Sequence, residues 1–484
     1  MRVPATAKSI GDEAFYNDYT LAVVSMKEGL ETIGERVFYN NRGILEFSIP
    51  GTVTSIGQNS FYGCTNTSVM SFEDGEGVLT IDTKNTRCAK IDALTNIGSY
   101  QDRKNDYFYD CPIELLYLGR DLKYNYSDDS YIYDLVDGKW KEVYRASAPF
   151  VNSTTLEEVQ IGPKVTFVYN HLCDNCDKLT SMLFPVGIQT IGGYAFKGCD
   201  KLASITFEES SDHSLSIETA AFKSCVALED ITYPGQLSVL GSSAYQGCEN
   251  LKSVIFNKNE QYQPALSIGD YTFAKCPLIT ELSFPGRLTS IGSFTFASCI
   301  SLSNVSFEDS NTAVKLGYGA SSLENSLKYD EKLPLFGNSN LTSLYIGRNI
   351  DYETVEAKGY SPFYKQQFLT DIRFSQAGTV TYCKDYLLYK VNNCESLILP
   401  ESLTSIGNWT FRGMSKLGRI VIPNAVTTIG EYTFADDTAL ESAKLSTSCA
   451  WLQQGLFSEC GKLQAITIPT VVTKMDTQMF HICI

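Results

Sequence analysis

The sequence predicts a solenoid, in which successive coils of chain stack on one another and share a parallel β-sheet. Three observations predict it: a repeat with a 23-residue step, a short alternating apolar segment in each repeat, and one aromatic ring per repeat. A fixed period of about 20 to 50 residues is typical of repeat arrays. A single repeat cannot bury its own apolar residues, so we expect each coil to be stabilised by stacking on its neighbours.

The repeat is numbered here from the apolar residue of an Ile-Gly pair, which is position zero. In one copy, Ile191 is followed by Phe196 at position five, Cys199 at position eight and Leu202 at position eleven. A Pro often follows at position seventeen. Position zero falls at Ile10, Ile33, Ile56, Val168, Ile191, Ile217, Leu240, Ile268, Ile291, Ile406, Ile429, Leu452 and Met475.

Positions thirteen to sixteen are predicted to form a short strand. In the copy at 202–207, the apolar residues Ile205 and Phe207 alternate with Ser204 and Thr206, which is the period of a half-buried strand. The Pro at position seventeen ends the strand, because Pro cannot donate a hydrogen bond to a sheet ladder.

Position five is predicted to stack one aromatic ring per coil on the side opposite this strand. Tyr245 and Cys173 are the departures from Phe. The Phe residues are Phe15, Phe38, Phe61, Phe196, Phe222, Phe273, Phe296, Phe411, Phe434, Phe457 and Phe480.

Position eight is predicted to carry a ladder of free, buried thiols and not a set of disulfides. Residues at one repeat position point the same way on successive coils, and Asn41 and Asp437 replace Cys in other copies, which does not suit an obligate bridge. The ladder would comprise Cys64, Cys111, Cys176, Cys199, Cys225, Cys248, Cys276, Cys299, Cys460 and Cys483.

The whole chain is predicted to be one solenoid, 1–484, of about 18 coils. Regular coils are interrupted at 73–167 and 308–405. The two interruptions resemble each other, because YLGRDLKY at 117–124 answers YIGRNIDY at 345–352. Insertions at one point of a repeat emerge from one edge of a solenoid, which is often its binding edge. Both termini cut through repeats, so we expect a fragment of a longer protein.

The bulk composition limits the functions that we expect. The net charge of −16 argues against nucleic acid and against anionic membrane as partners. No run of about 18 apolar residues is present, so no membrane insertion is predicted. With three His and no nucleophile motif, we expect no enzymatic activity.

Two constellations could hold a metal, and neither is predicted to do so. His171, Cys173 and Cys176 have zinc-like spacing, but the two cysteines occupy the ordinary positions five and eight. Small acidic groups such as Glu73-Asp74 and Glu208-Glu209 follow strands, where a solvated turn explains them better than calcium does. We expect neither metal nor cofactor.

The motif SIGxxAFxxCxxLxxIxxP resembles the BspA-type leucine-rich repeat family, and the resemblance covers nearly the whole chain. It implies an α/β-type solenoid, a right-handed superhelix with a parallel sheet on its concave face and short helical or irregular turns on its convex face. It also implies a secreted or cell-surface protein, adhesin-like, that binds a host extracellular-matrix protein such as fibronectin or fibrinogen, or a glycan.

We expect binding through the concave sheet and the inserted loops, because Tyr and Trp are favoured at recognition surfaces. An alternative is a structural spacer that presents another domain. A second alternative for the inserted rings is that they pack on the flank of the solenoid and anchor a long loop. The candidate ligand contacts are Tyr124, Tyr126, Tyr131, Tyr133, Trp140, Tyr144, Tyr352, Tyr360 and Tyr364.

Overall fold

The computed structural model describes residues 1–81, 112–124, 131–136, 139–144, 148–151, 153–318, 335–337, 339–353, 361–481 and 483, with backbone alone at 131–136 and 139–144. The chain divides into two compact units. Unit 1 comprises Met1–Gln236 and Gly247–Glu249, and unit 2 comprises Leu237–Gln246 and Asn250–Ile484. The two units are described separately, and one continuous solenoid over 1–484 stays a prediction.

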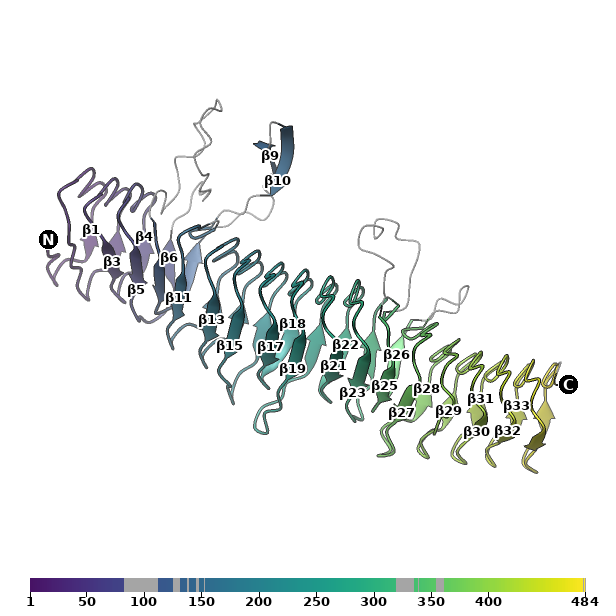
Figure 1. The fold of residues 1–484 in the computed structure, drawn as a ribbon. Helices are drawn as coiled ribbons and strands as arrows, with labels where there is room; N and C mark the ends of the chain where they lie inside the picture. The colour runs from purple at the N-terminus through teal and green to yellow at the C-terminus, as the bar shows by residue number, and fades with distance from the viewer. Residues whose placement is uncertain are drawn as a thin grey trace. The chain divides into compact units, whose positions relative to one another are not determined.

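Most regular coils contain two short strands, where the sequence predicted one (Figure 1). The predicted strand at positions thirteen to sixteen is present and is called the B strand. A second strand, the A strand, ends on the position-zero residue. Its two to four residues are too short to show a period in the sequence.

In unit 1 the A strands are β1 (Ser9–Ile10), β2 (Thr32–Ile33), β4 (Ser55–Ile56), β6 (Leu79–Ile81), β8 (Leu122–Tyr124), β12 (Phe167–Val168), β14 (Thr190–Ile191) and β16 (Leu215–Ile217). The B strands are β3 (Glu46–Ile49), β5 (Val69–Phe72), β7 (Leu115–Leu118), β11 (Glu158–Ile161), β13 (Ser181–Phe184), β15 (Ser204–Phe207) and β17 (Asp230–Tyr233). A hairpin, β9 (Tyr131–Val136) with β10 (Lys139–Tyr144), interrupts the coils.

In unit 2 the A strands are β18 (Leu237–Leu240), β20 (Leu266–Ile268), β22 (Leu288–Ile291), β24 (Val314–Leu316), β26 (Ile350–Tyr352), β28 (Tyr382–Cys383), β29 (Ser405–Ile406), β31 (Thr428–Ile429), β33 (Trp451–Leu452) and β35 (Lys474–Met475). The B strands are β19 (Ser253–Phe256), β21 (Glu281–Phe284), β23 (Asn304–Phe307), β25 (Ser343–Ile346), β27 (Asp371–Phe374), β30 (Arg419–Val421), β32 (Ser442–Lys444) and β34 (Ala465–Thr467).

Neighbouring coils pair in parallel and in register. Ile10 lies opposite Ile33, and Ile33 lies opposite Ile56, so position-zero residues form one continuous row. The B strands pair in the same way, with Ser283 opposite Ser306. The prediction of a parallel-sheet solenoid in which equal repeat positions align is therefore confirmed within each unit.

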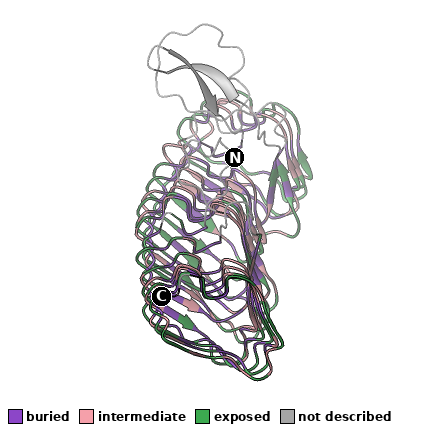
Figure 2. Cartoon of the chain, turned by 90° about the vertical axis from the view of Figure 1, so that its right-hand side faces the viewer, coloured by how far each residue is buried: buried purple, intermediate pink, exposed green. Residues whose placement is uncertain are grey.

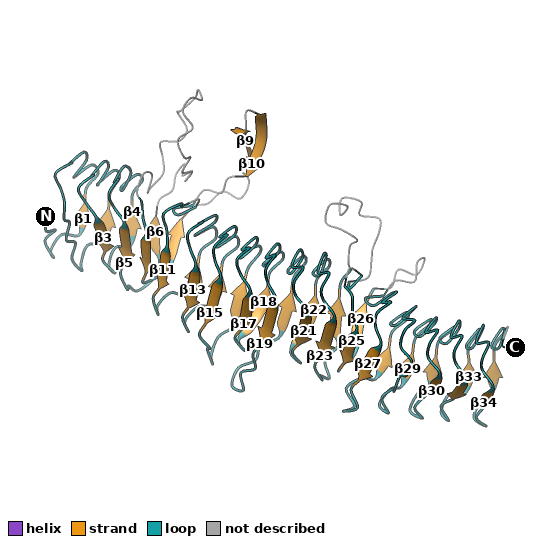
Figure 3. Cartoon of the chain, in the orientation of Figure 1, coloured by secondary structure: helices purple, strands orange, loops and turns teal. Residues whose placement is uncertain are grey.

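A third ladder of hydrogen bonds runs through the turns between the A and B strands. Positions three and seven have left-handed backbone, as at Arg36 (φ 49°) and Asn40 (φ 60°). The N–H groups of Arg36, Phe38 and Asn40 donate to carbonyls of the next coil at 2.6–2.8 Å. Within the described residues these connections contain turns and no helix (Figure 3), so the irregular form of the expected turns is the one found.

The predicted aromatic ladder at position five fills the core, and buried residues lie along the inner sides of the coils (Figure 2). Phe15, Phe38 and Phe61 stack at 5.5 and 5.8 Å between ring centroids. In unit 2, Phe336 and Phe363 carry the ladder through the second irregular block. Stacked rings at this distance stabilise neighbouring coils beyond the burial of their surface area.

The predicted thiol ladder is confirmed for the described cysteines at position eight, which are free and, except for the half-buried Cys483, buried. Cys111 lies outside the described residues. Each thiol donates to the position-five carbonyl of the preceding coil. Cys64 reaches the Phe38 carbonyl at 3.2 Å, and Cys299 reaches the Phe273 carbonyl at 3.1 Å. Burial raises the pKa of both Cys248 and Cys299 to about 12, so these thiols stay protonated at neutral pH.

The two irregular blocks share a buried arginine that clamps several coils. Arg120 donates to the carbonyls of Gly51 and Pro50 at 2.6 and 2.9 Å. Arg348 donates to the carbonyls of Glu308, Leu288 and Pro285 at 2.8–3.0 Å. The resemblance between the two blocks is therefore structural as well as sequential.

Candidate binding face

Two of the tyrosines predicted to contact a ligand belong to the core. Tyr124 is 2% exposed and donates to the Asn170 carbonyl at 2.9 Å. Tyr352, its counterpart in the second block, is 4% exposed and donates to the Asp385 carbonyl at 2.8 Å. Their rings are not available to a surface ligand in this structure, because they fill the interior where the irregular blocks join the regular coils.

Four more predicted contacts lie in the hairpin. The backbone register of β9 and β10 pairs Tyr131 with Tyr144 and Tyr133 with Glu142, and Trp140 also lies in β10. Their role in ligand contact stays a prediction. Tyr126 and Tyr360 lie outside the described residues.

Tyr364 is half-buried and belongs to an aromatic strip on the turns of unit 2 that the sequence reasoning did not assemble. Its ring stacks on Tyr389 at 5.4 Å. Tyr386, Trp409 and Tyr432 stand at position three of consecutive coils. Trp409 stacks on Tyr386 at 5.9 Å between ring centroids and packs against the tilted ring of Tyr432 at 4.9 Å. The 23-residue spacing of these three aromatics is the signal that could have found the strip.

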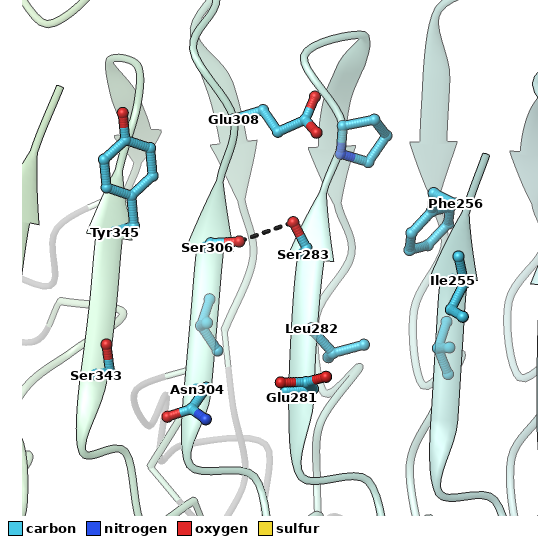
Figure 4. Close-up of a pocket in the computed structure, with 13 residues that line it drawn as sticks. Ile255, Phe256, Glu281, Leu282, Ser283, Asn304, Ser306, Glu308, Ser343 and Tyr345 are labelled. Carbon is cyan, nitrogen blue, oxygen red and sulfur yellow. Dashed lines mark hydrogen bonds between the residues drawn. The ribbon is translucent and has the colours of Figure 1, made fainter. Parts of the chain in front are cut away.

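The candidate site is a groove of about 300 Å³ on the solvent side of the B strands in unit 2, called the B face. Strands β19 and β21 belong to separate sheets, and the groove runs from β19 across to β25. Figure 4 shows Ser283, Ser306 and Tyr345 in one row across three strands. Ile255, which is 50% exposed, gives the groove an apolar side.

Hydrogen bonds fix the polar side chains of the groove. The Ser306 hydroxyl donates to the Ser283 hydroxyl at 2.8 Å. The Tyr345 hydroxyl donates to Asp309 Oδ1 at 2.6 Å. Burial, and then the hydrogen bond to the carboxylate of Asp309, raise the pKa of Tyr345, so its phenol stays neutral and can keep donating this hydrogen bond at physiological pH.

The two glutamates of the groove differ in whether they have hydrogen-bond or ion-pair partners. Glu308 accepts from the Gly286 N–H at 3.1 Å and from the Lys258 ammonium at 3.0 Å. Glu281 is exposed, and it has no hydrogen-bond or ion-pair partner within the described part of the chain. Lys258 lies in the insertion between β19 and β20, so an inserted edge loop reaches the groove.

The zinc-like constellation is fully engaged in the core. His171 Nδ1 lies 3.0 Å from Asp174 Oδ2, and both side chains are buried. The Cys176 thiol donates to the Phe150 carbonyl at 3.1 Å, as the other position-eight thiols do. Among the described residues, no three His, Cys, Asp or Glu side chains gather as a metal would require.

The acidic pairs after the strands act as turn caps. Glu208 accepts from the Val186 N–H of the preceding coil at 2.9 Å, in the same way that Glu308 accepts from Gly286. Asp74 accepts from the Tyr117 hydroxyl at 2.5 Å. Hydrogen bonds of this kind to a carboxylate are strong.

The described residues contain no long apolar helix of the kind that crosses a membrane.

The sequence matches the family described as BspA type leucine rich repeat region, in six copies over residues 1–123, 146–267, 266–352 and 356–484. No match was found among curated proteins.

Three solved structures are similar to the chain. A leucine-rich repeat protein from Bacteroides ovatus is 16% identical over 97% of this chain and 91% of that chain, with a TM-score of 0.42. A leucine rich cell surface protein from Faecalibacterium prausnitzii is 17% identical over 99% and 89%, with a TM-score of 0.28. The pneumococcal vaccine antigen PcpA is 17% identical over 66% and 74%, with a TM-score of 0.30.

Proposed function

Because the chain belongs to the BspA-type leucine-rich repeat family, we propose that it is a non-enzymatic, surface-exposed or secreted scaffold that binds a protein partner through its B face. The family resemblance favours an adhesin-like role, in which the partner is an extracellular-matrix protein. A surface glycan is the alternative partner. A solenoid presents a preformed surface, so little ordering entropy is lost on binding.

The observation that carries the proposal is the groove of unit 2. It combines an exposed apolar residue, Ile255, with hydroxyls held by hydrogen bonds and with Glu281, a carboxylate without a described partner. Polar groups placed around an apolar patch are typical of ligand sites, whereas coil packing alone does not require them.

Surface plasmon resonance on immobilised fibronectin, fibrinogen and mucin glycans tests the proposal. Ser283→Trp fills the groove, and we expect it to weaken binding by about tenfold or more, since steric exclusion removes the central contact. Ile300→Trp is the control, because Ile300 is 57% exposed on a turn of the same unit, outside the groove. Equal binding by both variants, or no binding by the unmodified chain, would contradict the proposal.

A further inference from the structure

The row of hydroxyls in the groove of unit 2 has a copy in unit 1. In unit 2, Ser283 pairs with Ser306, and Ser306 pairs with Tyr345. In unit 1 the same register pairs Ser48 with Ser71 and Ser71 with Tyr117. Each row, called here a serine–tyrosine row, lies at position fifteen of three consecutive B strands.

The acids around the two rows correspond as well. Glu46 and Glu281 begin the first strand of each row, and both are exposed. The second strand is followed by Glu73-Asp74 in unit 1 and by Glu308-Asp309 in unit 2. The tyrosine hydroxyl donates to the aspartate in both: Tyr117 to Asp74 at 2.5 Å, and Tyr345 to Asp309 at 2.6 Å.

The rows recur in both blocks, whereas several other exposed or half-buried positions differ between the blocks. On the turns, Gln58, Thr65 and Asn66 correspond to Ser293, Ile300 and Ser301. On the B face itself, Val69 and Leu115 correspond to Asn304 and Ser343. Core packing does not require the rows, because their side chains are half-buried or exposed.

We propose that each unit carries one copy of the same binding site, the serine–tyrosine row with its acids, and that each copy takes a cationic side chain, Lys or Arg, of a partner protein. This inference rests on the proposed function and names the chemistry of the partner. It gives two equivalent sites per chain.

Charge complementarity identifies the occupant. Each copy has three carboxylates. The buried guanidinium near them, Arg120 near Glu73 and Arg348 near Glu308, is bound to backbone carbonyls, and the local balance stays acidic. Carboxylates bind Arg and Lys through charge-assisted hydrogen bonds, and the tyrosine ring offers a face to a cation.

One copy already binds a cationic side chain of the chain itself. The Lys258 ammonium of an inserted loop lies 3.0 Å from Glu308 in the unit 2 copy. In unit 1 the corresponding Glu73 accepts a hydrogen bond from the Ser48 hydroxyl, and no lysine is paired with it among the described residues. Lys164 lies near Asp74 of this copy, but its ammonium is paired with Glu76. We therefore expect the unit 1 copy to bind more tightly, and Lys258→Ala to strengthen the unit 2 copy.

Isothermal titration of the full chain with a capped hexalysine peptide, at low salt, tests the inference. We expect two peptides per chain. Glu46→Gln with Tyr117→Phe should abolish one site, Glu281→Gln with Tyr345→Phe the other, and the four changes together both. The control, Glu249→Gln with Glu459→Gln, removes two charges from exposed turn positions, as many as the four row changes together, and should leave both sites intact. Circular dichroism confirms that each variant is folded.

The inference is overturned if the row variants leave the stoichiometry unchanged, or if the control weakens binding as much as they do, which would show non-specific attraction to an acidic chain. Its failure is distinguishable from that of the proposed function. If Ser283→Trp abolishes capture of a matrix protein but the row variants still capture it, the proposed function stands and the cationic site is refuted. If the chain binds two peptides but captures no matrix protein, the cationic site stands and the proposed function is refuted.

Discussion

At the scale of single residues, position eight shows why Cys and Asn exchange in this repeat. Where it carries either residue, the side chain donates a hydrogen bond to the position-five carbonyl of the preceding coil. The Cys64 thiol does so at 3.2 Å, and Asn41 Nδ2 reaches the Phe15 carbonyl at 2.6 Å. The sequence predicted a small buried side chain here, but the need for a donor follows only from the position of that carbonyl.

The raised thiol pKa values predict alkaline instability. In the unfolded chain a thiol titrates near its usual pKa of about 8.5, whereas burial raises the pKa of Cys248, Cys299 and Cys383 to about 12. The contribution of these thiols to stability is therefore constant below about pH 8.5 and falls above it, by about 1.4 kcal/mol per pH unit for each such thiol.

Urea unfolding between pH 8 and pH 10 measures this slope. Cys248→Ser with Cys299→Ser keeps the hydrogen-bond donors and removes two titrating groups, so its stability should fall less steeply with pH. An identical slope in the variant would refute the assignment.

Asp437 places a carboxyl group at position eight, and replacing it is expected to stabilise the chain. It is buried; Oδ1 accepts from the Met414 N–H at 2.8 Å, and burial raises the pKa of Asp437 well above its usual value. A raised folded-state pKa means that stability is lost as pH rises above the unfolded pKa of about 3.9. Asp437→Asn should therefore stabilise the chain at pH 7 by about 1–3 kcal/mol.

The gain should vanish below about pH 4, where the carboxyl is neutral in both states. Asp436→Asn is the matched control, because Asp436 pairs with Arg412 at 2.6 Å and its loss should not stabilise. Thermal unfolding at pH 3.5 and pH 7 compares the two; stabilisation at both pH values would argue against titration of Asp437.

At the scale of elements, the B strands and the aromatic ladder could be predicted from the sequence, because alternation and the 23-residue step are both visible there. The A strand could not, since a pair such as Thr32–Ile33 is too short for any period. The turn ladder was also missed. It depends on left-handed backbone at ordinary residues such as Arg36 and Trp409, which sequence rules assign mainly to glycine.

The arginine clamp predicts a large cost for one substitution. Arg348→Ala removes the donor from three carbonyls, so the free energy of unfolding of unit 2 should fall by roughly 2–5 kcal/mol. Arg373→Ala is the control: Arg373 is exposed, and its ion pair with Asp371 should contribute about 1 kcal/mol or less. Denaturant unfolding compares them, and equal losses would refute the clamp.

The hairpin predicts a deletion that leaves the coils intact. Strands β9 and β10 pair with each other and with no other described strand. Replacing 131–144 by a short Gly-Ser linker should shift the melting temperature by about 2 °C or less. Deleting 120–144 should destabilise strongly, because it also removes Arg120 and Tyr124 from the core. If the variant that lacks 131–144 still captures matrix proteins, the hairpin is not a ligand contact. That result would exclude Tyr131, Tyr133, Trp140 and Tyr144.

At the scale of the whole molecule, family membership could be predicted from the sequence, because one motif recurs in register through both units. The candidate site was harder. Serines at position fifteen, such as Ser71 and Ser306, look like ordinary solvated strand residues until the register sets them beside Tyr117 and Tyr345. The sequence drew attention to the tyrosines at 124 and 352 instead, and the structure places both in the core.

The central claim is that the B face, and not the turns, contacts the partner. Photo-crosslinking tests it directly, with benzoylphenylalanine placed at Ser306 or at Ile300 and the chain incubated with fibronectin or fibrinogen. The account predicts an adduct from position 306 and none from position 300. An adduct from position 300 alone, or equal yields from both positions, would contradict it.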